Sequence, residues 1–332
     1  MAKKVFATKF GPNVVLSKPK QYGVAKNYLQ FFSGIDTQTG FNMTDVNKFF
    51  GPSVLEVQCI TDKDVTEETV QNYLYSSIVQ DVGPLGRLEH ILRQNIKQRA
   101  TPAGSVISPQ IQFLICRNGT RGLAPLPLRE YYYSMWFKLD AKLDEKLIIP
   151  AAGPGGSGWY SLAEVKTGGW GGDATFGDFR HILGVFKDAD GLYYKIAGDN
   201  AANGLGKVPG ITAYNIATPY WRQRTKSGSV KLGVWQKLEV YIKKPIDCND
   251  LTSGVAWYAI TQARQQERII IGHKLGGKQM GDANLPDTRI FLGANYSGGD
   301  SPIVTDFTDL EIWDGLPFAQ SARFNNNTMK DF

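Results

Sequence analysis

Two segments of the chain alternate strictly along their length, and this alternation constrains the fold more than any other feature. One face of residues 131–139 carries Tyr131, Tyr133, Met135, Phe137 and Leu139. In residues 235–243, one face carries Leu238, Val240 and Ile242, and the other carries Lys237, Glu239, Tyr241 and Lys243. A period of two residues is that of a β-strand. Strands with one apolar and one polar face are typical of antiparallel sheets that cover a core.

Further strand-like segments follow at short intervals and are separated by loops rich in glycine. They are residues 54–60, 110–116, 182–186, 192–196, 255–260, 268–271, 289–293 and 307–313. Residues 187–191, between two of these segments, read as a hairpin loop ending in Gly191, a residue that can adopt a positive φ. Short strands at this spacing predict a mainly β protein, an antiparallel β-sandwich or jelly roll.

One region departs from this pattern and predicts helices. Asp64 and Glu67 have the spacing of a helix capping box, and the dipeptide Gly83-Pro84 interrupts the helical spacing that follows. A second helical spacing follows in Leu85, Leu88, Ile91, Leu92 and Ile96. We therefore expect N-terminal strands and an arm, part of the sandwich, then a short helical hairpin insertion, the jelly-roll sandwich and a C-terminal tail. The expected boundaries are 1–63, 64–104, 105–320 and 321–332.

The series of strands from about residue 130 to 317 resembles a known family. The resemblance rests on residues 132–138, 159–166, 230–241, 291–296 and 306–313. These are similar to strands of the concanavalin A-like jelly rolls found in polysaccharide lyases and laminin G-type domains. The resemblance implies two curved antiparallel sheets packed face to face, a fold used for sugar binding, sugar cleavage or particle building.

The lyase families also carry catalytic strands, and parts of these are similar to Arg180-His181 and Tyr193-Tyr194-Lys195. A lyase must neutralise a uronate carboxylate and remove a weakly acidic proton with a positioned base. If the chain is a lyase, the resemblance implies Arg180, His181, Tyr194, Lys195, Glu164 and Lys166 as its catalytic set. The family's Gln-x-His strand is missing. The alternative is that His181 is a hydrogen-bonded strand residue and that Tyr194 packs in the core.

Sugar binding without chemistry requires only exposed aromatic rings and nearby polar groups. The candidates in or beside loops rich in glycine and proline are Trp159, Trp170, Tyr214 and Trp221. Asp306 and Asp309 offer oxygen ligands for Ca²⁺ near the last strand, and no other cofactor is expected.

Composition limits the partners and the compartment. The net charge of +6 is scattered along the chain, which argues against nucleic-acid binding. No run of apolar residues is long enough for a membrane span, and no signal peptide is recognisable. The three cysteines are odd in number, so we expect reduced thiols in a protein made in the cytoplasm.

These features favour a non-enzymatic protein of a bacteriophage particle, a capsid-decorating or tail component that is structural or recognises carbohydrate. Its expected partners are other virion subunits and cell-surface polysaccharide, in an oligomer or larger assembly, since an edge strand or arm can add to a neighbour's sheet. Two alternatives remain open: a polysaccharide lyase or depolymerase acting by β-elimination on an acidic polysaccharide, and a cellular carbohydrate-binding module.

Overall fold

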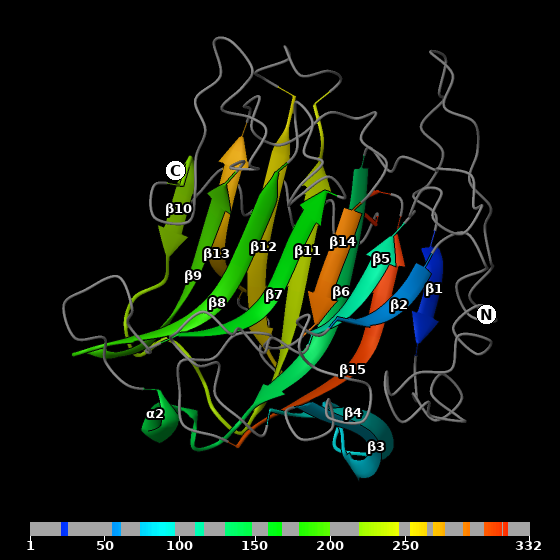
Figure 1. The fold of residues 1–332 in the computed structure, drawn as a ribbon, viewed down its shortest axis with the longest axis vertical. Helices are drawn as coiled ribbons and strands as arrows, with labels where there is room; N and C mark the ends of the chain where they lie inside the picture. The colour runs from blue at the N-terminus through cyan, green and yellow to red at the C-terminus, as the bar shows by residue number, and fades with distance from the viewer. Residues whose placement is uncertain are drawn as a thin grey trace.

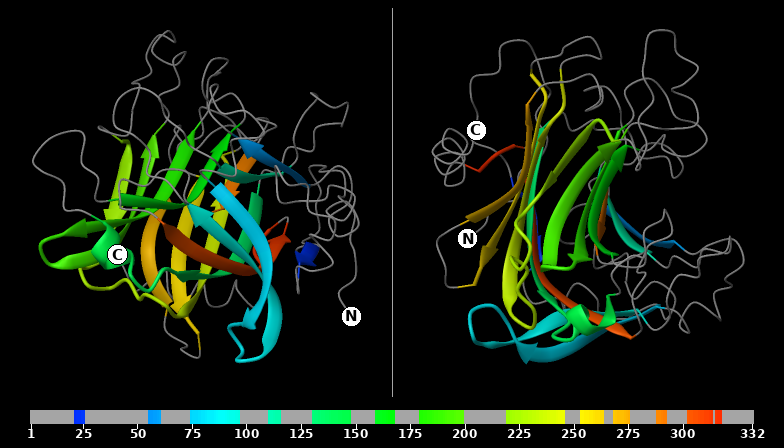
Figure 2. Two further views of the ribbon diagram at one scale, coloured as in Figure 1. Left: turned by 60° about the horizontal axis from the view of Figure 1, so that its bottom comes forward. Right: turned by 90° about the vertical axis from the view of Figure 1, so that its left-hand side faces the viewer.

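The described part of the chain forms two antiparallel sheets that pack face to face (Figures 1 and 2). The computed structural model describes residues 21–25, 55–60, 74–96, 110–115, 130–147, 159–167, 179–199, 219–245, 253–263, 268–275, 288–292, 302–313 and 315–317. Almost all of these residues lie in strands or in the turns between them. The predicted antiparallel β-sandwich of the jelly-roll type is therefore confirmed.

Sheet A has the strand order β13-β12-β11-β6-β15-β4-β3, and β1 pairs with β15 outside that path. Its strands are β1 (Gln21–Ala25), β3 (Leu74–Val82), β4 (Leu88–Ile96), β6 (Glu130–Leu139), β11 (Trp235–Lys243), β12 (Val255–Gln262), β13 (Arg268–Leu275) and β15 (Ile303–Trp313).

Sheet B has the strand order β10-β9-β8-β7-β14-β5-β2. Its strands are β2 (Leu55–Ile60), β5 (Gln110–Ile115), β7 (Trp159–Thr167), β8 (Arg180–Asp188), β9 (Gly191–Asp199), β10 (Trp221–Arg224) and β14 (Thr288–Leu292). One short helix, α2 (Leu143–Lys146), follows β6. Among the described residues, no helix is long and apolar enough to cross a membrane.

The core lies between the two sheets, on the faces that the alternation predicted. The apolar face of β6 is buried along its whole length, as is that of β11. Both faces join one core cluster with residues of sheet B such as Leu183 and Val185. Cross-sheet hydrogen bonds add to this packing, including one between the hydroxyl groups of Tyr160 and Thr305. The face assignment made for these two strands is confirmed.

The turn between β8 and β9 also follows the sequence expectation. Gly191 has a φ of +117°, a backbone conformation that side-chain-bearing residues rarely adopt. The Gly228 amide donates to the Leu192 carbonyl at 2.8 Å, so a neighbouring loop fixes the hairpin.

The predicted helical hairpin within residues 64–104 is wrong for the part that the structure describes. Residues 74–96 form a β-hairpin, with β3 and β4 paired from end to end. The apolar residues there satisfy a period of two as well as a helical spacing, for example Leu88, Leu92 and Ile96 on one face of β4. Pairing of β4 with β15 in sheet A decides between the two, because tertiary context overrides a weak local preference.

Candidate functional site

The residues proposed for catalysis lie on three neighbouring strands of sheet B, β7, β8 and β9, and the alternation of these strands divides them between two faces. His181 and Tyr194 share the inner face, because both bond to residues of sheet A. Glu164, Arg180 and Lys195 take alternate positions and therefore belong to the outer face. The structure does not bring the predicted set together at one site.

His181 is fully buried between the sheets. Its Nδ1 lies 3.0 Å from the hydroxyl oxygen of Tyr258, and its Nε2 lies 2.6 Å from that of Tyr220. Its ring also lies 4.8 Å from that of Phe179 and 5.2 Å from that of Trp221, centroid to centroid. Burial lowers the pKa of His181 to about 3, so the ring is neutral near neutral pH. This is a core histidine with both nitrogens engaged.

Tyr194 is buried in the same layer. Its hydroxyl donates to Gln236 Oε1 at 3.0 Å, and burial raises the pKa of Tyr194 far above its usual value. A hydroxyl held this way cannot act as a base on a solvent-borne polymer. The lyase interpretation was therefore wrong for His181 and Tyr194, and their core alternative is confirmed.

Lys195 projects from the outer face of β9 and is the most perturbed cation described there. Its Nζ lies 3.5 Å from the centroid of the Phe186 ring. Burial first, and then the charges of Arg222 and Arg224, lower the pKa of Lys195 to about 8. Within the described part of the chain, its ammonium group has no hydrogen bond or ion pair. An ammonium group placed among cations and without a carboxylate suits an anionic ligand.

Arg222 and Arg224 extend this basic surface onto β10. Arg222 is opposite Ala197 and Arg224 is opposite Lys195 in the strand register. The guanidinium carbon of Arg224 lies 3.6 Å from the centroid of the Tyr193 ring, and its Nη2 donates to Asp188 Oδ2 at 2.9 Å. The sequence reasoning missed both arginines. The alternation Trp221-Arg222-Gln223-Arg224 was the signal that places them on one face.

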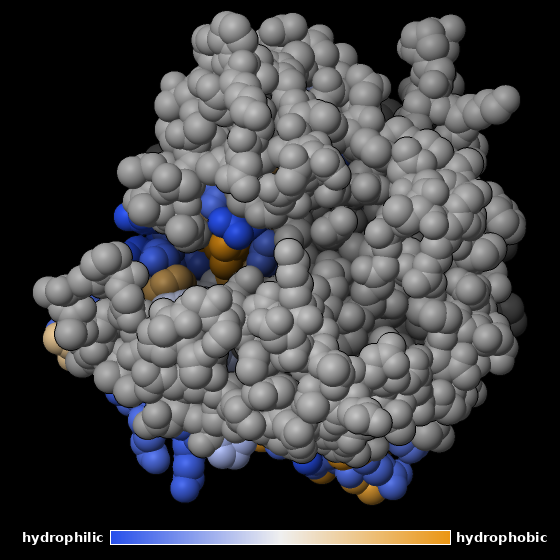
Figure 3. Space-filling model, in the orientation of Figure 1, coloured by the Kyte–Doolittle hydropathy of each residue, from blue (hydrophilic) through white to orange (hydrophobic). Residues whose placement is uncertain are grey.

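Two aromatic rings form the base of this cluster. Phe186 and Tyr193 face each other across β8 and β9, with ring centroids 5.8 Å apart and planes inclined by 20°. We call Phe186, Tyr193, Lys195, Arg222 and Arg224 the basic face. Figure 3 shows a hollow in this side of the molecule, in front of β8, β9 and β10, where hydrophilic and hydrophobic side chains are visible between grey residues.

The remaining polar residues of the outer face are held more tightly. Arg180 binds Asp199 through two hydrogen bonds, of 2.6 and 3.1 Å, and the Asp199 side chain is 1% exposed. Glu164 is also buried, at 4% exposure. The backbone of Lys166 pairs with that of Arg180, and its side chain lies outside the described residues. The charge of Arg180 is thus offset by Asp199, whereas no carboxylate among the described residues offsets that of Lys195.

The structure changes the list of sugar-stacking aromatic residues. Trp221 is not a loop residue: it begins β10, is 6% exposed, and packs against His181 and Tyr258 because its position in the alternation points inward. Trp159 begins β7 and is half-buried. Trp170 and Tyr214 lie outside the described residues.

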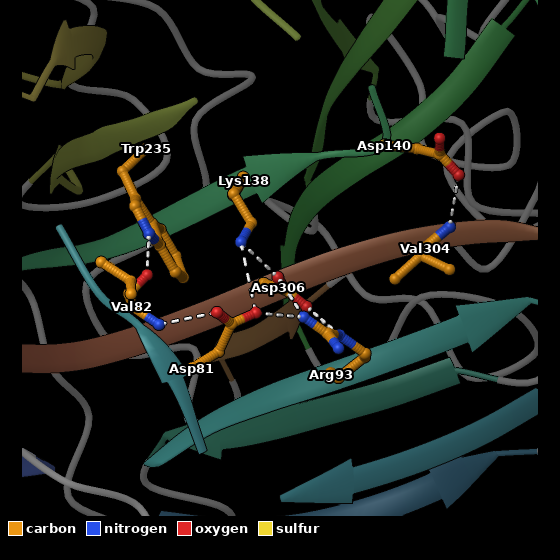
Figure 4. Close-up of polar contacts among 8 residues, drawn as sticks. All are labelled: Asp81, Val82, Arg93, Lys138, Asp140, Trp235, Val304 and Asp306. Atoms are coloured by element: carbon orange, nitrogen blue, oxygen red, sulfur yellow. Dashed lines mark hydrogen bonds and ion pairs between the residues drawn. The ribbon is translucent and has the colours of Figure 1, made fainter. Parts of the chain in front are cut away.

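Asp306 belongs to a polar cluster on the outer face of sheet A (Figure 4). Its carboxylate accepts from Arg93 Nε at 2.7 Å and lies 2.9 Å from Lys138 Nζ, and both cations also approach Asp81. A carboxylate already neutralised by two cations is a poor ligand for Ca²⁺. Asp309 has a φ of +52° at an irregularity in the pairing of β15 with β6, a backbone role that aspartate tolerates.

The described residues contain no group of three or more His, Cys, Asp or Glu side chains that could hold a metal ion.

Comparisons with known proteins find structural likeness only. No protein-family model matches the chain. No curated protein matches it either. Solved structures that are similar to it include polysaccharide lyases, binding domains of botulinum neurotoxins, and lectins.

A PL-14 alginate lyase from Aplysia kurodai has a TM-score of 0.48 and 9% identity, covering 88% of this chain and 98% of its own. An alginate lyase from Chlorella virus has a TM-score of 0.44 and 11% identity, and the match covers 84% of this chain and 98% of the lyase. The lectin UEA-II, complexed with galactose, has a TM-score of 0.34 and 9% identity, with coverages of 78% and 97%. The fold assignment rests on the strand order and packing described above.

Proposed function

We propose that the basic face binds an acidic polysaccharide and that the protein recognises this polymer without cleaving it. The observation that carries the proposal is the gathering of Lys195, Arg222 and Arg224 on neighbouring strands of one face. Asp188 offsets the charge of Arg224, whereas Lys195 has no carboxylate partner among the described residues, so a bound anion would offset the repulsion that lowers its pKa. A polymer with one carboxylate per sugar supplies negative charges along its length.

The aromatic pair supports a sugar rather than a simple anion. Phe186 and Tyr193 are partly exposed beneath the cations. Aromatic rings at a polar surface offer an apolar face for a sugar ring, while the cations bind its acidic groups. Asp188, the carboxylate that binds Arg224, lies at the end of β8 and orients the guanidinium group rather than neutralising Lys195.

Calorimetric titration with an oligomer of uronic acids tests the proposal, with neutral dextran as the comparison polymer. Binding of the acidic oligomer should weaken as salt is added, because surface charge interactions are screened. Lys195→Met should weaken binding by about tenfold, since a hydrogen bond to a charged group is worth about 1.5–3 kcal/mol. Lys237→Met, a matched change on sheet A, should leave binding unchanged.

Equal binding of dextran, or equal loss in the Lys195 and Lys237 variants, would contradict the proposal.

The pH dependence gives a second test. Lys195 is charged below its pKa of about 8 and loses its charge above it, while the uronates stay ionised throughout. Affinity should therefore fall as the pH rises from about 7 to about 9. Lys195→Arg should keep its affinity over the same range, because arginine remains charged.

A lyase activity is the second candidate, and the lowered pKa of Lys195 is what favours it. An amine with a pKa of about 8 can accept a proton near neutral pH. In β-elimination, Lys195 Nζ would take the proton at C5 of a uronate, a C4–C5 double bond would form, and the C4–O bond would break with its electron pair on the oxygen, which would take a proton from water. Ultraviolet absorbance of the unsaturated product tests this, and its absence across alginate, hyaluronate and glucuronan would leave recognition alone.

A place in a bacteriophage particle, as a capsid-decorating or tail subunit, stays a prediction from the sequence. Purified particles probed with an antibody against the chain test it.

A further inference from the structure

The β3–β4 hairpin ends sheet A with a strand that has one unpaired edge among the described residues. β3 is last in the strand order, and β4 is its one partner among the described strands. Natural edge strands are usually protected by lysine, proline, bulges or shortness. β3 is nine residues long, contains neither lysine nor proline, and pairs with β4 without a shift in register. Such an edge is suited to pairing with another strand.

The hairpin turn shows which backbone groups point to the free edge. The Gly83 amide donates to the Arg87 carbonyl at 2.8 Å, so this opposed pair is a hydrogen-bonded one. Hydrogen-bonded and non-hydrogen-bonded pairs alternate along an antiparallel ladder. Because the register continues unbroken, residues 81, 79, 77 and 75 bond to β4. The backbone groups of residues 82, 80, 78, 76 and 74 therefore point away from it. Those of Val82 are already bonded, because its amide donates to Asp81 Oδ1 at 2.7 Å and its carbonyl accepts from Trp235 Nε1 at 2.8 Å, so the groups left for a partner are those of residues 74, 76, 78 and 80.

These five positions have the same order of apolar and polar residues whether the strand is read forwards or backwards. They are Leu74, Ser76, Ile78, Gln80 and Val82, which alternate apolar and polar about Ile78. We propose that β3 pairs with β3 of a second copy of this chain, antiparallel about a two-fold axis at Ile78. An interface of this kind brings the same surface of both subunits together, so a self-matching pattern is what it requires.

In this register the free amides and carbonyls of Ser76, Ile78 and Gln80 find partners. Ile78 stands opposite the partner's Ile78, and Ser76 stands opposite the partner's Gln80. Asp81 is the only charged residue of β3, and it stands opposite the partner's Tyr75 rather than another carboxylate. The two copies therefore meet without like charges face to face.

Exposed apolar side chains at the closed end of the hairpin point to the same partner. Val82 is 49% exposed, Leu88 is 68% exposed and Leu85 is 70% exposed. Figure 2 shows this closed end extending beyond the rest of the sheet. Large apolar side chains gathered at one exposed tip are typical of an interaction surface. The inference is independent of the proposed function, since the basic face lies on sheet B.

Sedimentation of the full chain over a wide concentration range tests the pairing. Wild type should form a dimer of twice 36.7 kDa. Gln80→Pro removes an amide that points to the free edge and leaves the β3–β4 hydrogen bonds in place. It should weaken the dimer at least about tenfold, because two intermolecular hydrogen bonds disappear. Gln80→Ala, which keeps the amide, should dimerise like wild type.

Hydrogen exchange in the wild-type protein gives a readout that needs no variant. The amides of Ser76, Ile78 and Gln80 should be protected at high protein concentration and exchange faster on dilution. The proposal is overturned by a wild-type monomer at all concentrations, by a Gln80→Pro protein as dimeric as wild type, or by protection of these amides that does not change on dilution.

Discussion

The buried histidine between the sheets predicts how stability depends on pH. His181 has a pKa of about 3 in the folded protein, against 6.5 for an unperturbed histidine. The unfolded chain therefore binds a proton between these values that the folded protein does not bind. Lowering the pH through this window favours the unfolded state. The loss begins as the pH falls below about 6.5 and is complete near pH 3.

The magnitude follows from the two pKa values. Near pH 8 the ring is neutral in both states and contributes nothing to the pH dependence. At about pH 5 the unfolded histidine is almost fully protonated, which lowers the free energy of unfolding by about 2 kcal/mol. At about pH 4 the loss reaches about 3 kcal/mol. This is a large share of the roughly 5–15 kcal/mol that stabilises a typical domain.

Urea unfolding followed by tryptophan fluorescence, at a series of pH values, measures this loss. His181→Gln is the comparison, because glutamine can still bond to Tyr258 or Tyr220 but does not titrate. The variant should be less stable near pH 8, yet its loss down to about pH 5 should be smaller than that of wild type by about 2 kcal/mol. Carboxylates titrate equally in both proteins and cancel. Equal losses in the two proteins would falsify the assignment of a neutral, buried His181.

Three further predictions test the core and the polar cluster by the same unfolding measurement. Asp306→Asn should lower the free energy of unfolding by on the order of 3 kcal/mol, because Arg93 and Lys138 lose the buried one of the two carboxylates that they share, and added salt should reduce the difference. Phe137→Ala should cost about 3–5 kcal/mol by leaving a cavity in the core, and a cost under about 1 kcal/mol would contradict its burial. Gly191→Ala should cost about 1 kcal/mol or more, because a φ of +117° strains a residue that has a side chain, and an unchanged stability would contradict this.

The strands were predictable because their apolar residues follow a single period. Residues 131–139 and 235–243 fit no helix, and both form central strands of sheet A. The helical prediction for residues 74–96 was wrong because their apolar positions fit both a helical period and a period of two. The strand that decides between these periods, β15, lies more than 200 residues later in the chain. Local sequence cannot reveal a partner at that distance.

In the candidate site, the odd or even position of a residue along its strand (its parity) predicts the face to which the side chain points, but not which strands lie side by side. His181 has the same parity as Leu183 and Val185, and Tyr194 the same parity as Leu192 and Ile196, so their inward direction could have been read from the sequence. The meeting of Lys195 with Arg224 could not, because it depends on the pairing of β9 with β10, which the local sequence does not reveal.

The position of β15 has a consequence for how the chain folds. This strand comes after every other described strand in the sequence, yet it lies in the middle of sheet A between β6 and β4. Until it is synthesised, two strand edges that will be internal face the cellular milieu, and the β3–β4 hairpin has no sheet to join. Non-local pairings of this kind fold slowly and expose intermediates to aggregation. If translation stopped before residue 303, sheet A would lack the strand that joins β6 to β4. Dependence on chaperones should therefore be greatest late in translation.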